Sequence, residues 1–211
     1  MKRSGEDIES KFLNKTLIAS GNKFAFYLVD FTVGEKVIKN YESLEPIKFS
    51  QLGFEDCTLI PLLERGGSQV SQNLWTFLFY EFSPPLDRYI VEFPGFEIKD
   101  DDFKASLEQK FSEITGFPLK TFELLENVDK VPNIYSDPAC CTKRSRAVSA
   151  KIKVDDDEFL KLENDKKISL VEIEGNICEK FRKIAKERGA ILSDKAWYWA
   201  LGKSFQTKGV F

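Results

Sequence analysis

The residues best suited to chemistry lie in residues 95–117, where several acidic side chains occur at helical spacing close to Lys110. A magnesium site needs several oxygen ligands in near-octahedral geometry, so its carboxylates must share one face of a helix. Here Lys110 and Glu113 are three residues apart, close enough to pair across one helical turn. We therefore expect an internal ion pair in this segment and no competent metal site.

The composition restricts the remaining chemistry. The chain has 211 residues, 31 basic and 34 acidic side chains and no histidine. This excludes Ser/His/Asp and Cys/His nucleophiles, a histidine base and any metal site that contains histidine. The net charge of −3 argues against non-specific binding of nucleic acid by the whole surface.

The cysteines and the hydropathy pattern indicate the compartment. The four cysteines, Cys57, Cys140, Cys141 and Cys178, lack metal-type spacing, and an adjacent pair is unlike a structural disulfide framework. We expect reduced thiols. No apolar stretch has the length of a signal or a membrane span, so we predict a cytoplasmic protein without membrane contact.

Alternating apolar residues predict a set of strands. A hairpin is expected over residues 23–37 around Gly34, and further strands over residues 57–63, 74–82, 89–93, 146–154 and 168–173. The acidic segment 155–167 is expected to be the loop between the last two strands.

Helical spacing replaces this alternation in three places. Residues 100–116 predict a helix that ends at Gly116, and Asn176 and Ser193 are suited to cap two C-terminal helices. Residues 203–211 show no clear period. In the segment Trp197, Tyr198 and Trp199, a rotation of about 100° per residue predicts that at least one ring points outward or into an interface. The pattern predicts an α+β protein.

The segment around the first helix resembles the signature of the Nudix hydrolase family. That signature is GX5EX7REUXEEXGU, and residues 88–117 read RYIVEFPGFEIKDDDFKASLEQKFSEITGF with the spacing intact. The matching positions are Gly95, Asp101, Gln109, Lys110, Glu113, Ile114 and Gly116. Of the three glutamates in REUXEE, only Glu113 remains, so the resemblance is to a degenerate Nudix box.

Other segments resemble the ADP-ribose or ADP-sugar pyrophosphatase branch of this family. They are FYEFSPPLDRYIVEFPG, YSDPACC and SDKAWYWALGK, in the order that this branch has. The resemblance implies a Nudix-type α/β/α sandwich with N-terminal antiparallel strands. It implies a strand region over residues 1–55, which in this branch packs across a homodimer, and a Nudix-fold domain over residues 56–211.

In active family members the signature glutamates hold Mg²⁺, which bridges the substrate diphosphate. Here a lysine and an isoleucine replace two of those ligands, so we expect no metal and no cofactor. Other carboxylates could restore a site: Glu92, Glu97, Asp101, Glu108, Asp155, Asp156, Asp157, Glu158 and Asp165. We expect these to be surface or helix N-terminal residues.

The nucleotide pocket is also altered relative to this branch. Tyr41 stands where the branch has a tryptophan that stacks on adenine, which preserves an aromatic face. Ser83 stands where an arginine would meet the diphosphate, and a hydroxyl cannot supply the charged fork of a guanidinium.

These features favour a catalytically inactive Nudix-fold protein that binds a macromolecule: RNA, the ribosome or a protein. An active Mg²⁺-dependent ADP-ribose or ADP-sugar diphosphatase and a non-catalytic nucleotide sensor remain the alternatives. The candidate binding residues are Lys143, Arg144, Arg146, Lys151 and Lys153 on one strand, and Lys203, Phe205, Lys208 and Phe211 in the C-terminal segment. A charge-guarded edge strand and a tail that folds onto its own domain explain these groups equally well.

Overall fold

The structure is a computed structural model that describes residues 10–47, 56–66, 73–97, 103–116, 122–127, 130–135, 139 and 141–207. The chain divides into two compact units. Unit 1 comprises Met1–Glu55 with Asn133–Ser145, and unit 2 comprises Asp56–Pro132 with Arg146–Phe211. Asp101, Cys140, Lys208 and Phe211, which carry sequence predictions, lie outside the described residues.

Unit 1 is built on a three-stranded antiparallel sheet of β1 (Ser10–Ser20), β2 (Phe24–Val33) and β3 (Lys36–Pro46). The predicted hairpin around Gly34 is present as β2 and β3, and Gly34 has a φ of +58° that suits a residue without a Cβ. β1 was not expected from alternation, because its pairing with β2 shifts register twice.

Unit 2 contains a mixed sheet whose strands run in the order β12-β6-β5-β4-β10-β8. Its strands are β4 (Asp56–Arg65), β5 (Leu74–Ser83), β6 (Arg88–Glu92), β7 (Gly95–Glu97), β8 (Phe122–Leu124), β10 (Arg144–Val154), β11 (Ile168–Glu172) and β12 (Ile191–Leu192). β11 also pairs with β5, β7 with β4, and the short β9 (Ile134–Tyr135) with the unit 1 end of β10. Each predicted strand of this unit is present, within two residues at either end.

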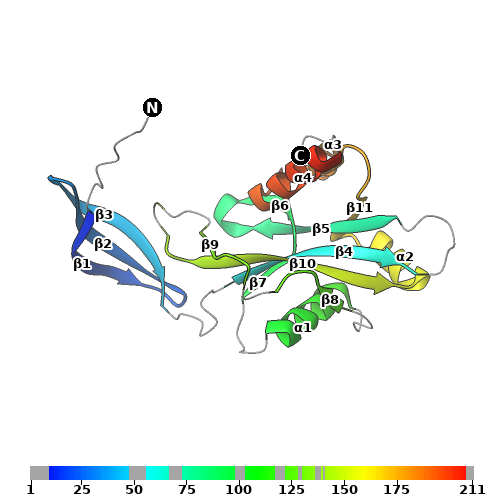
Figure 1. Cartoon of the computed structure of the whole chain (residues 1–211), viewed down its shortest axis with the longest axis horizontal. Helices are drawn as coiled ribbons and strands as arrows, with labels where there is room; N and C mark the ends of the chain where they lie inside the picture. The colour runs from blue at the N-terminus through cyan, green and yellow to red at the C-terminus, as the bar shows by residue number, and fades with distance from the viewer. Residues whose placement is uncertain are drawn as a thin grey trace. The chain divides into compact units, whose positions relative to one another are not determined.

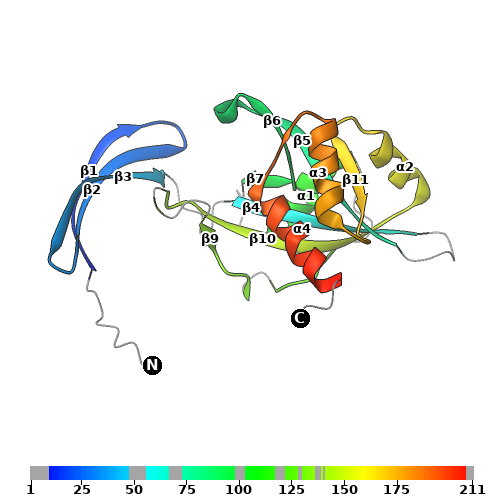
Figure 2. The ribbon, with the colours of Figure 1, turned by 90° about the horizontal axis from the view of Figure 1, so that it is seen from above.

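Helices cover both faces of the unit 2 sheet (Figures 1 and 2). α1 (Phe103–Thr115) packs on one face, where the rings of Phe77 and Phe111 are 6.0 Å apart. α3 (Ile177–Glu187) and α4 (Asp194–Thr207) cover the other face. Leu78 and Phe181 are fully buried in the core beneath these two helices. Successive side chains of a strand point to opposite faces of the sheet, so each face contributes side chains to the core beneath its helices. This gives the predicted α/β/α layering.

The C-terminal helices begin where the sequence predicts. Asn176 accepts a hydrogen bond from the backbone of Glu179 at 3.3 Å, and the Ser193 hydroxyl accepts one from Ala196 at 3.3 Å. The acidic segment was wrongly predicted as a loop, because it forms α2 (Asp156–Asn164). Residues 203–211 showed no clear period in the sequence, but the first five of them belong to α4, which continues to Thr207.

Among the described residues, no helix is long and apolar enough to cross a membrane. Cys57, Cys141 and Cys178 are free thiols, and burial raises the pKa of Cys57 to about 12.

Candidate functional site

The exposed side of α1 holds a small, self-contained polar group. Lys110 Nζ lies 2.5 Å from Glu113 Oε2, and Gln109 Nε2 donates to Glu113 Oε1 at 2.9 Å. Both carboxylate oxygens of Glu113 therefore accept from neighbours on the same helix. A cation approaching Glu113 would have to displace these donors and meet the Lys110 ammonium at close range.

The other positions of the degenerate box that the structure describes supply no oxygen ligand from a side chain. Ile114 is a half-buried hydrocarbon next to Glu113. Gly95 begins β7 and pairs with Thr58 of β4, and Gly116 follows α1 with a φ of +73°. Gly95 thus begins a strand, and Gly116 ends α1 in the left-handed backbone conformation. Both glycines therefore act through the backbone.

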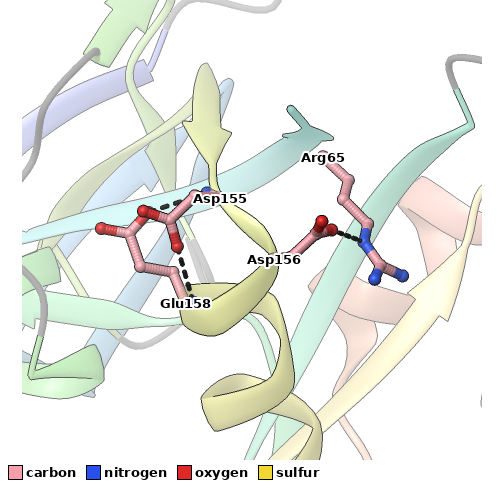
Figure 3. Close-up of polar contacts among 4 residues, drawn as sticks. All are labelled: Arg65, Asp155, Asp156 and Glu158. Atoms are coloured by element: carbon pink, nitrogen blue, oxygen red, sulfur yellow. Dashed lines mark hydrogen bonds and ion pairs between the residues drawn. The ribbon is translucent and has the colours of Figure 1, made fainter. Parts of the chain in front are cut away.

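The acidic side chains of residues 155–158 lie at the N-terminus of α2, and three of them make local contacts there (Figure 3). The Asp155 carboxylate accepts from the Glu158 backbone at 2.9 Å, and the Glu158 carboxylate accepts from the Asp155 backbone at 2.9 Å. This is a capping box, and Glu158 is only 8% exposed within it. Asp156 turns to the other side and pairs with Arg65 at 2.5 Å.

Four further carboxylates considered for a rescued site, all in described parts of the chain, have local roles or face solvent. Glu108 pairs with Lys104 at 3.7 Å along α1, and Asp165 accepts from the Lys167 backbone at 2.7 Å. Glu97 and Asp157 are exposed. Within the described part of the chain, no group of three or more Cys, Asp or Glu side chains is arranged to hold a metal ion.

A pair of carboxyl groups, Glu81 and Glu92, lies on β5 and β6, and only Glu92 was considered from the sequence. Glu92 faces Phe79 and lies diagonal to Glu81, which faces Ile90. Burial, with a hydrogen bond to Glu81 and its charge, raises the pKa of Glu92 to about 7. Lys195, whose Nζ donates to Thr58 Oγ1 at 2.9 Å, opposes this shift. The pair holds a proton near neutral pH, which is a poor state for a cation ligand.

The two residues expected in a nucleotide pocket lie in different units. Tyr41, in unit 1, donates its hydroxyl to the Ala139 carbonyl and meets Phe31 edge-on at 5.5 Å. Ser83, in unit 2, precedes the 3-10 turn Pro84–Leu86 and makes no side-chain capping bond there. Neither residue supplies positive charge for a diphosphate.

The five basic candidates around β10 differ in their surroundings. Lys143 and Arg144 belong to unit 1, whereas Arg146, Lys151 and Lys153 belong to unit 2. Lys151 pairs with Glu64 at 2.6 Å, and this hydrogen bond raises its pKa. Lys153 is exposed and alternates with the buried Ile152 and Val154. On this strand the charge of Lys151 is therefore neutralised by Glu64.

The aromatic residues of α4 are distributed over three environments. Trp199 stacks on Phe181 at 5.9 Å, and Trp197 lies beneath Arg182 at 4.6 Å. Tyr198 is 68% exposed, which confirms that one of the three rings turns outward. Lys203 Nζ lies 5.9 Å from the Trp199 ring, and Phe205 is 40% exposed.

Comparison with solved structures shows the fold. The crystal structure of an ADP compounds hydrolase matches with a TM-score of 0.56 and 11% identity, covering 96% of this chain and 97% of the other. A mutT/nudix family protein from Listeria innocua matches with a TM-score of 0.37 and 14% identity, covering 74% and 92%. The first similarity shows that the chain shares the fold of that hydrolase, which confirms the predicted α+β fold with N-terminal antiparallel strands, and the second is too weak to add to it.

No protein family description matches the chain, and no curated protein matches it. At 11% identity the structural similarity is one of fold, and a fold does not by itself imply an activity.

Proposed function

We propose that this protein is a non-hydrolysing member of the Nudix fold that acts as a binding module for a macromolecule. The observation that carries the proposal is the occupation of Glu113 by Lys110 and Gln109. A diphosphatase of this fold depends on divalent cations that stabilise the charge of the reacting diphosphate. A hydrocarbon at Ile114 and an ammonium at Lys110 oppose that chemistry at the position where it would occur.

The acidic segment supports the same proposal. A catalytic base must reach the water that it activates, and its carboxylate must be available to accept a proton. Asp155 and Glu158 instead hold the first turn of α2, and Asp156 binds Arg65. Their structural roles account for the acidic residues without a catalytic one.

The partner we propose is RNA, alone or in the ribosome, with a protein as the alternative. We propose that the protein needs no cofactor for this binding function. The protein is further proposed to be a homodimer through unit 1, because one face of that sheet exposes Phe12, Leu17 and Tyr41. Exposed apolar groups in such density are typical of an interface.

A product assay tests the absence of hydrolysis. Wild-type protein is incubated with ADP-ribose, with and without Mg²⁺, and AMP is quantified by chromatography. We expect no AMP above the protein-free control under either condition. Magnesium-dependent AMP release that disappears in Glu113→Gln would establish the diphosphatase alternative.

A further inference from the structure

We propose that the outer face of α3 and α4 is a docking surface for single-stranded RNA, an inference that rests on the proposed non-hydrolytic binding function. The surface is defined by Arg182, Lys183 and Lys186 of α3 and by Tyr198, Gly202 and Phe205 of α4. We call the first three the basic ridge and the last three the aromatic stripe. Figure 2 shows the two helices side by side as the outer layer of unit 2.

Charge is concentrated in this layer. Residues 177–207 contain seven basic and three acidic side chains, a net charge of +4 in a chain whose net charge is −3. Three of the seven basic side chains, Lys180, Arg188 and Lys195, donate to groups outside these two helices. The basic side chains proposed for the outer face are Arg182, Lys183 and Lys186, which are all exposed, and Lys183 pairs with Glu187 at 3.8 Å. A local positive field on an acidic protein favours a polyanion at this face over other parts of the surface.

The aromatic stripe distinguishes RNA from other polyanions. Tyr198, Gly202 and Phe205 follow one another at spacings of four and three residues, so they share one side of α4. Tyr198 is 68% exposed and Phe205 is 40% exposed. Unpaired bases stack on such rings whatever their identity, whereas an acidic peptide gains little from them.

Gly202 leaves space between the two rings. A Cβ at this position would meet no atom of the described chain within 4 Å, so internal packing does not require a glycine here. Glycine weakens a helix relative to other residues, which makes an exposed one within α4 costly to the isolated protein. The rise of the helix separates residues 198 and 205 by about 10 Å, and the gap over Gly202 admits a flat base.

One residue of the basic ridge, Arg182, contacts α4 directly. Arg182 lies over the Trp197 ring with 4.6 Å between the guanidinium carbon and the ring centre. This contact holds the guanidinium beside the residue that precedes Tyr198. A phosphate could be met by Arg182 while the neighbouring base stacks on Tyr198, as is common in single-strand recognition.

Fluorescence anisotropy with a short labelled oligouridylate tests this surface. We expect the double variant Tyr198→Ala with Phe205→Ala to bind about tenfold more weakly or worse, as the removal of base stacking implies. The exposed Tyr135, outside the surface, provides the control Tyr135→Ala, which should bind as the wild type does.

A matched pair of charge variants isolates the electrostatic contribution to RNA binding. Lys183→Glu with Lys186→Glu should weaken binding and flatten its salt dependence by about 0.7 in log–log slope for each phosphate that is no longer neutralised. Lys36→Glu with Lys39→Glu changes the net charge equally in unit 1, on side chains that are also exposed, and should have little effect.

A substitution at Gly202 separates docking from folding. Gly202→Leu should raise the melting temperature, because leucine favours the helix, yet it should weaken RNA binding by filling the gap.

Three results would overturn the proposal: no RNA binding by the wild type at low salt, equal weakening in the surface and control variants, or polyglutamate competing as well as RNA. None of these results changes the outcome of the AMP assay, so the RNA-binding surface and the non-hydrolytic function can be refuted separately.

Discussion

The Lys110 ammonium is bound to the Glu113 carboxylate one helical turn further along α1, at 2.5 Å. The contact is local to one helix, so it forms whenever α1 forms. Its energy is modest because Glu113 is 47% exposed. We propose that its effect on metal binding is larger, because the ammonium opposes a divalent cation and the ion pair occupies Glu113, the one glutamate at the positions that match REUXEE.

Restoring carboxylates should therefore restore a metal site. The double variant Lys110→Glu with Ile114→Glu adds two oxygen ligands and removes the competing charge. We expect Mn²⁺ to bind it at least about tenfold more tightly than the wild type, measured by electron paramagnetic resonance of the free ion. Lys104→Glu with Ala105→Glu adds the same number of carboxylates earlier on α1 and should not reproduce the gain.

Stability should depend on the carboxyl pair of Glu81 and Glu92. The pKa of Glu92 rises from 4.5 to about 7 in the folded protein, so the folded state holds its proton more tightly between these values. Its contribution to stability is present below pH 4.5 and is lost as the pH rises through 7. Asp194 strengthens this effect, and Lys195 weakens it.

Removing the charge should remove the pH dependence. We expect Glu92→Gln to be more stable than the wild type above pH 7, on the order of 2 kcal/mol, in urea unfolding followed by circular dichroism. The exposed Glu163 provides the control Glu163→Gln. A wild-type stability that rises steadily between pH 4.5 and 7 relative to Glu92→Gln would contradict this assignment.

The capping box of α2 should be important for stability. Asp155→Ala removes the acceptor for the Glu158 backbone and should lower the free energy of unfolding by about 1–2 kcal/mol. Asp157→Ala removes an exposed carboxylate of the same turn and should cost less. Urea denaturation of the two variants measures the difference, and an equal destabilisation in both would contradict the capping role.

Self-association should depend on one face of the unit 1 sheet. The register places Phe12 opposite Phe31 and Leu17 opposite Tyr27, so both exposed side chains lie on the same face. Phe12→Lys with Leu17→Lys should convert a dimer to a monomer in light scattering coupled to size exclusion. Val37→Lys, which lies opposite Thr32 on the other face, should leave the mass unchanged. A wild-type protein that is monomeric at all concentrations would refute the dimer.

Local patterns predicted much of the fold because the relevant signals are local. The helical period of residues 100–116 predicted α1, and the apolar residues that give this period, Phe103, Leu107 and Phe111, are buried. The caps at Asn176 and Ser193 are also present. The error at α2 was avoidable, because Asp155 and Glu158 have the spacing of a capping box just before Phe159.

Other features depend on tertiary packing that the sequence alone does not specify. Glu81 and Glu92 become neighbours only through the register of β5 with β6. The position of Arg182 over Trp197 depends on how α3 packs against α4. β1 was missed because its register shifts near Leu13 and Ile18 interrupt the alternation that predicts a strand.

A crystal structure of the wild-type protein with Mn²⁺ and ADP-ribose tests the central claim most directly, because the anomalous signal of manganese locates the ion. We predict no ion at Glu113 and an intact ion pair between Lys110 and Glu113. An ion about 2.1 Å from a Glu113 oxygen, bridged to the diphosphate, would contradict the account.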